Sequence, residues 1–169
     1  MKKILLTLMM VMVGLLILTT TVFYNLKSNS VYYAKNMPRG EGQKPELVML
    51  IDNLDWIYKP NTEGIKYDFD GTRDIINETG SKGFGNIYSD KTEYVYSNGD
   101  SIVYRFTKNF ELKHATRLRK METVDISSVD KNKLVEEIEQ FVKPVMDEQT
   151  KPMINLQWLF NLLYQDEFK

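Results

Sequence analysis

The 169-residue chain contains no cysteine and a single histidine. The absence of cysteine excludes disulfides, thiolate zinc sites, iron–sulfur clusters and thiol catalysis. With one histidine there is no site with several histidine ligands, and a Ser–His–Asp triad would depend on His114 alone. The formal net charge is −1, so the chain as a whole lacks the positive excess of a nucleic-acid-binding protein. We therefore expect no cofactor, no metal centre built on cysteine or histidine, and no nucleic-acid partner.

Charged residues are also missing from a long stretch near the N-terminus. After the basic start Met1-Lys2-Lys3, residues 4–26 contain no charge over 23 positions. A helix of that length reaches roughly 35 Å, enough to cross a hydrocarbon core with some tilt. Tyr24 suits the headgroup level, where aromatic rings concentrate. Residues 1–27 are therefore predicted to be an uncleaved signal anchor or a cleaved signal peptide.

The residues after the apolar run bear on that choice. Ser28-x-Ser30 is an acceptable peptidase site, and Tyr32-x-Ala34 is a poor one. The length of the run and the absence of a clear Ala-x-Ala favour the anchor. Short N-terminal signals keep the N-terminus inside, which predicts a single-pass protein of the cell membrane with residues 28–169 outside the cytoplasm, secreted if the signal is cut.

Beyond residue 27 the chain has the composition of a small acidic domain. Lys2, Lys3 and Lys27 take three of the 22 basic residues, which leaves 19 basic against 23 acidic residues, a net charge of −4. Residues 28–44 contain Pro38 and two glycines and little hydrophobic periodicity, so they are predicted to form a linker that lifts the domain off the bilayer. Residues 45–169 are predicted to form one extracytoplasmic domain.

Hydrophobic periodicity predicts an α+β fold for that domain, with an antiparallel meander packed against helices. Apolar residues at helical spacing indicate a helix over 45–59, ended by Pro60. Alternating and Tyr-rich runs predict strands at 64–69 and across 84–120, with Asn98-Gly99 as a hairpin turn. A helix from about residue 130 is expected to kink or end early at Pro144.

The C-terminal segment is predicted to be a helix over residues 153–168. Its apolar residues surround almost the whole circumference. Such a helix is either buried on several sides or meets a partner. An exposed Trp158 would indicate a docking surface.

One short motif matches a catalytic box. Asp68-Phe69-Asp70-Gly71-Thr72 resembles the Asp-x-Asp-Gly-Thr box of the haloacid-dehalogenase-like phosphatases, in which one aspartate attacks phosphorus, the second is the acid/base and Mg²⁺ lies between them. That box ends a buried parallel strand, whereas the residues before Asp68 are half polar and hairpins follow. The interpretation as a plain Asp-Gly turn is favoured, with an Mg²⁺-dependent phosphatase as a minor alternative. Whether the Asp68–Asp70 turn holds a cation is left open.

Other candidate residues lie in the predicted strands. His114 alternates with apolar residues, so it is expected on the core side of the sheet as a structural histidine. Lys113, Arg117 and Arg119 are expected to share the opposite face, with Arg105 joining them across the hairpin. Such a cationic face on an acidic domain suits an acidic protein or anionic headgroups, although a solvated outer face is the simpler interpretation.

The order of these features resembles that of the TipC-type immunity proteins. The likeness covers the basic start, the anchor helix, the Tyr32-Tyr33 pair, an early helix, the Tyr-rich meander with its strand over 102–113, and a charged helix before a Trp-containing tail. Members are membrane-anchored proteins of Gram-positive bacteria that protect the producer from a cognate LXG-class secreted toxin. The resemblance implies a non-catalytic domain that blocks a toxin's cleft by surface complementarity.

Three hypotheses follow from the sequence. The first is a non-enzymatic, membrane-tethered binding protein that neutralises a secreted toxin, with Arg105, Lys113, Arg117, Arg119 and Trp158 as candidate contact residues. The second is an accessory or structural subunit of a membrane assembly. The third is the phosphatase.

Overall fold

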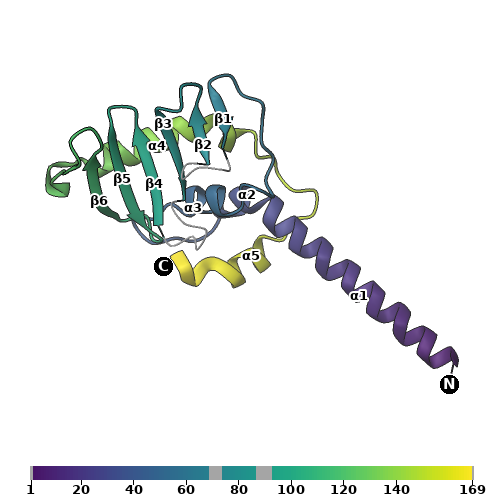
Figure 1. The fold of residues 1–169 in the computed structure, drawn as a ribbon. Coiled ribbons are helices and arrows are strands. Elements are labelled where there is room, and N and C mark those ends of the chain that lie inside the picture. The colour runs from purple at the N-terminus through teal and green to yellow at the C-terminus, as the bar shows by residue number, and fades with distance from the viewer. Residues whose placement is uncertain (1, 69–73, 87–92, 169) are drawn as a thin grey trace.

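The N-terminal run forms one continuous helix. The computed structural model describes residues 2–68, 74–86 and 93–168, and α1 spans Lys2–Ser28. It is long and apolar enough to cross a membrane and protrudes from the rest of the molecule (Figure 1). Its threonine hydroxyls donate to carbonyls of the preceding turn, as at Thr20 Oγ1 to Leu16 O, 2.8 Å. These hydroxyls therefore need no water, which suits a lipid environment.

The segment expected to be a linker is part of the folded domain. Residues 30–35 form helix α2 (Ser30–Lys35), in which Val31, Tyr33 and Ala34 are fully buried. Residues 28–44 were predicted to be a linker that lifts the domain off the bilayer, but residues 30–35 of that range are packed into the domain instead. Its burying partners lie far away in sequence: the Gln157 side chain donates to Tyr33 O at 2.9 Å, and the Gly40 amide donates to Phe168 O at 2.8 Å.

Helix α3 (Pro45–Asp52) follows and is shorter than the predicted 45–59. It begins with Pro45, whose missing amide hydrogen costs nothing in the first turn. Tight turns replace the helix after Asn53, whose carbonyl accepts from the amides of Trp56 (2.8 Å) and Ile57 (3.1 Å). Ile57 is still buried, so the turns preserve the apolar pattern that predicted a longer helix.

The middle of the chain forms a seven-stranded antiparallel meander in which the strands lie in sequence order. This confirms the predicted α+β class with its meander. The strands are β1 (Ile65–Tyr67), β2 (Ile75–Asn77), β3 (Lys82–Asn86), β4 (Glu93–Asn98), β5 (Ile102–Thr107), β6 (Leu112–Arg117) and β7 (Glu122–Thr123). The predicted Asn98-Gly99 turn joins β4 to β5, with Gly99 at φ +92°, a conformation that glycine adopts without strain.

After a short 3₁₀ turn, η1 (Ile126–Ser128), helix α4 (Lys131–Asp147) packs against the sheet. Asp130 caps its first turn by accepting from the Lys133 amide at 3.1 Å. Pro144 lies inside the helix, which continues to Asp147 and so does not end at the proline. The C-terminal segment forms α5 (Gln157–Tyr164) and the 3₁₀ helix η2 (Gln165–Phe168), shorter than the predicted 153–168.

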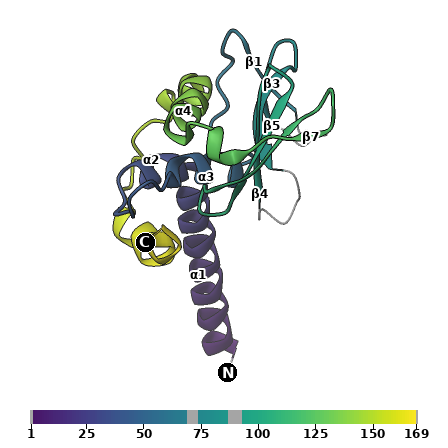
Figure 2. The ribbon, with the colours of Figure 1, turned by 90° about the vertical axis from the view of Figure 1, so that its left-hand side faces the viewer.

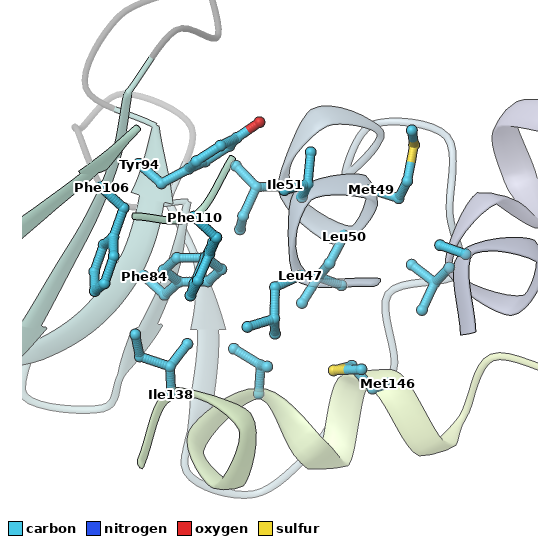
Figure 3. Close-up of a cluster of buried hydrophobic side chains, with 14 of the residues drawn as sticks. Leu47, Met49, Leu50, Ile51, Phe84, Tyr94, Phe106, Phe110, Ile138 and Met146 are labelled. Atoms are coloured by element: carbon cyan, nitrogen blue, oxygen red, sulfur yellow. The ribbon is translucent and has the colours of Figure 1, made fainter. Parts of the chain in front are cut away.

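The helices α2, α3 and α4 lie on one side of the sheet, and α5 lies beyond α2 and α3 near the base of α1 (Figures 1 and 2). The core lies between the sheet and these helices. Leu47 and Leu50 from α3 face Phe84, Tyr94 and Phe110 from the sheet side, and Ile138 of α4 closes the cluster (Figure 3). Burial of these large apolar side chains is the main favourable contribution to folding.

Candidate binding surfaces

The candidate basic residues belong to strands β5 and β6 and to the turn that follows. In the sheet register Tyr104 lies opposite Ala115, and both are buried toward the helices. Arg105 lies opposite His114, and both are exposed. Because successive side chains of a strand point to opposite faces, Arg105 and His114 lie on the outer face of the sheet.

The position of His114 corrects the prediction that it faces the core. Phe106 pairs with Leu112 and Arg105 with His114, so β6 has one extra residue at Lys113. A β-bulge of this kind shifts the alternation of side chains by one position. Leu112 is therefore buried on the core side, as expected, while His114 is placed on the outer side next to Arg105.

Lys113 is engaged in an ion pair rather than free to meet a partner. Its ammonium group donates to the carboxylate of Glu93 on β4, at the edge of the same outer face. This hydrogen bond, supported by the electrostatic effect of the nearby Lys113, Arg105 and His114 side chains, lowers the pKa of Glu93 below its usual value. The charge of Lys113 is thus partly neutralised in place.

Arg117 does not share a face with Arg105. It lies opposite Ile102, which alternates with Tyr104 on the helix-covered side, and its guanidinium reaches Glu122 of β7 at 3.5 Å. The single cationic face predicted from the sequence is therefore divided between the two faces of the sheet. Because of the bulge, Arg105 and Arg117 point to opposite faces of the sheet, which simple alternation did not predict.

Arg119 lies in the turn between β6 and β7, which forms the end of the sheet away from α1 (Figure 2). The same turn exposes two apolar side chains, Leu118 and Met121, the latter with 78% of its surface accessible. Lys120 is exposed beside them. This tip therefore combines basic and apolar groups, whereas the sequence pattern indicated only the basic ones. We call residues 118–121 the distal tip.

Trp158 is far from these residues along the fold. It lies on α5, is 67% exposed and belongs to the layer at the base of α1 (Figure 1). The five candidate residues thus form no single surface. Arg105, Arg117 and Arg119 belong to the β5–β7 end, Lys113 is held by Glu93, and Trp158 lies on α5.

The Asp-x-Asp-Gly-Thr box lies largely outside the described residues, since only Asp68 of its five positions is placed. The Asp68 amide donates to Asp74 O at 3.0 Å beside β1, which pairs with β2 in antiparallel fashion. The phosphatase box belongs instead to a parallel sheet. Across the described ranges, no group of three or more acidic or histidine side chains is arranged to hold a metal ion.

Two hollows were not anticipated from the sequence. One, of about 700 Å³, lies between the 41–43 loop, the turn around Phe110 and the start of α4 at Lys131. The other, of about 300 Å³, is lined by Tyr24, Trp56 and Tyr58 at the base of α1. The aromatic residues of the second hollow are far apart in the sequence and come together only in the fold, so no local pattern predicts it.

Comparison of the chain with protein-family models, with curated proteins and with solved structures finds no match.

Proposed function

We propose that the protein is a non-enzymatic binding protein, tethered outside the cytoplasm by α1, and that it acts as an immunity protein neutralising a secreted toxin. The observation that carries this proposal is the continuity between the apolar helix and the folded domain. A tether that is built into the domain keeps a binding surface at the membrane that a toxin must approach.

The last turns of α1 are part of the core. Leu26 is 6% exposed, and the Asn25 side chain accepts from the Tyr33 hydroxyl at 2.6 Å. Cleavage at either candidate site would remove these contacts, and the sites themselves include the buried Ser30 and Ala34. This arrangement supports the uncleaved anchor over the cleaved signal peptide.

The partner surface that the geometry favours is the distal tip, flanked by Arg117 on the helix-covered side of the sheet and by Arg105 on its outer side. These residues lie at the β5–β7 end, away from α1 (Figures 1 and 2). Arginine and methionine are enriched in protein interfaces, and an exposed Leu118 and Met121 give apolar anchors between basic groups. A toxin with an acidic surface around its cleft fits this combination.

The test is protection of cells from a toxin encoded beside the gene. Cells with the full chain should survive the toxin, and cells with Arg105→Glu, Arg117→Glu and Arg119→Glu combined should lose protection. The matched control changes three exposed lysines of α4, Lys131, Lys133 and Lys143, to glutamate, which alters net charge equally. The control should still protect.

The outcomes separate the hypotheses. Equal protection by both triple variants would contradict the proposed surface, and absence of any protective effect would contradict the immunity function. Asp68→Asn with Asp70→Asn should leave protection intact, because the proposed mechanism needs no phosphoryl transfer. Loss of protection in that double variant, at unchanged protein level, would favour the phosphatase.

A further inference from the structure

Helix α5 has one face buried against the domain and one apolar face that is exposed. Its inner face is built on Phe160, which is fully buried, with ring centroids 5.3 Å from Tyr33 and 4.7 Å from Tyr164. Its outer face exposes Trp158 (67%), Leu162 (65%) and Leu163 (55%). Large apolar side chains gathered on one exposed helix face usually mark an interaction site.

This outer face lies at the depth where α1 leaves the domain. The Asn25 side chain donates to Ile154 O at 3.1 Å, and the Tyr33 hydroxyl accepts from the Leu156 amide at 3.1 Å. Met153 and Ile154, which precede α5, are exposed as well. Both views place α5 beside the upper end of α1, on the side away from the sheet (Figures 1 and 2).

The length of α1 sets where the membrane surface lies. The uncharged run of residues 4–26 reaches roughly 35 Å, whereas the hydrocarbon core is about 30 Å thick. The last turn of the run, around Tyr24 and Asn25, therefore lies at the headgroup level when α1 spans a bilayer. Any segment hydrogen-bonded to Asn25 lies at the same level.

The turn after α3 also places aromatic side chains at the headgroup level. Trp56, in the turn after α3, packs edge-on against Phe23 of α1 with ring centroids 5.5 Å apart. Trp56, Tyr24 and Tyr58 remain 43%, 58% and 61% exposed and line the smaller hollow. Tryptophan and tyrosine favour the membrane–water interface, where the ring is apolar and the polar edge is hydrated.

The residues in and around α5 carry no charge that would oppose contact with lipid. Between Lys151 and Asp166 the chain has no charged residue. An interfacial helix buries its apolar face in the headgroup and acyl boundary, and a charge on that face would oppose burial. The outer face of α5 has no such charge along its length.

We infer that α5 lies in the interface of the same bilayer that α1 crosses, with Trp158, Leu162 and Leu163 inserted among the lipids. The domain thus rests on the membrane, held at two points, rather than standing off it on a spacer. This inference rests on one part of the proposed function, the retained anchor, and is independent of the toxin. The outer face of α5 contacts lipid rather than a protein partner, because the hydrogen bonds of Ile154 and Leu156 to Asn25 and Tyr33 hold α5 at the membrane surface.

The test uses the protein's two tryptophans, Trp56 and Trp158. The full chain with Trp56→Phe is reconstituted into vesicles of phosphatidylcholine and phosphatidylglycerol, with lipids brominated high on the acyl chain as quenchers. Because an interfacial helix buries its apolar face roughly 5–10 Å deep, Trp158 should lose about half of its fluorescence. It should also be shielded from acrylamide in the water.

A charged substitution gives the matched control. Leu162→Asp in the Trp56→Phe background should abolish most of the quenching of Trp158. Leu118→Asp, which changes a comparably exposed leucine at the distal tip, should leave it unchanged. Equal quenching in both variants would overturn the inference.

The remaining outcomes separate this inference from the anchor itself. Vesicle flotation with Trp158 open to acrylamide and insensitive to brominated lipid would overturn the inference and leave the anchor standing. Shielding of Trp158 from both quenchers would assign the face to a protein, a second copy included, and would also overturn it. Failure of the chain to float with vesicles would overturn the anchor and the inference together.

Discussion

The two ends of the domain expose opposite chemistry. At the base of α1, exposed side chains from three separate segments are large and apolar, as at Tyr24, Trp56 and Trp158. At the β5–β7 end, apart from Leu118 and Met121 of the distal tip, they are mostly charged, and several are paired, as Lys113 is with Glu93. The difference indicates that one end is suited to an apolar environment and the other to water and a charged partner.

The largest expected effect separates the inner and outer faces of α5. Phe160→Ala should lower the free energy of unfolding by about 4 kcal/mol, because it opens a cavity in the contact with Tyr33. Trp158→Ala should change it by less than about 0.5 kcal/mol in detergent micelles, since its side chain is exposed. Urea unfolding of the full chain measures both, and similar losses would contradict the two-faced description.

The next effect tests how the supposed linker is tied to the domain. Arg39 contacts Glu46 of α3 at 2.5 Å, and the Glu46 side chain is only 8% exposed. Arg39→Ala should destabilise the protein by about 2 kcal/mol, because it leaves a buried carboxylate without its partner, although the arginine itself is partly hydrated. Arg39→Lys should recover part of the loss in thermal unfolding. No loss from the alanine variant would contradict a stabilising role for the Arg39–Glu46 pair.

A smaller effect is expected where α4 holds the sheet. The Tyr96 hydroxyl donates to Glu137 Oε1 at 2.7 Å, and Lys82 reaches the same carboxylate oxygen at 3.2 Å. Tyr96→Phe should cost about 1 kcal/mol, the usual net value of such a hydrogen bond. The matched control is Tyr104→Phe on the neighbouring strand, where the Tyr104 ring stacks on that of Tyr96 with centroids 6.4 Å apart. In urea unfolding, this variant should lose less stability than Tyr96→Phe.

The smallest effect concerns pH at the outer face. The Lys113 hydrogen bond lowers the pKa of Glu93 from its ordinary 4.5, so ionised Glu93 contributes stability above that pH and the contribution is lost as pH falls through the lower folded value. Glu93→Gln should therefore be less stable than the wild type at neutral pH, with the difference vanishing in acid. Lys113→Met should remove the same pH dependence. Parallel acid-unfolding curves for the wild type and Glu93→Gln would contradict the pair.

Much of the fold follows from local sequence patterns. The Asn98-Gly99 turn and the Tyr-rich run before it predicted the central hairpin, in which Tyr94, Tyr96, Tyr104 and Phe106 are buried on the helix side. The candidate surface was less predictable. One extra residue at Lys113 reversed the side chain of His114, and an insertion of this kind has no clear signature in a polar strand.

The sequence alone determined the apolar helix, the central hairpin and the presence of helix α4, because each depends on residues close together in the chain. Only the tertiary structure decided that residues 30–35 are buried and that α5 lies beside Asn25. Those outcomes depend on contacts between segments more than a hundred residues apart, such as Tyr33 with Leu156 and Asn25 with Ile154. A short segment such as residues 30–35 becomes part of the core when residues far away in the sequence cover it, and no local sequence pattern indicates which residues those are.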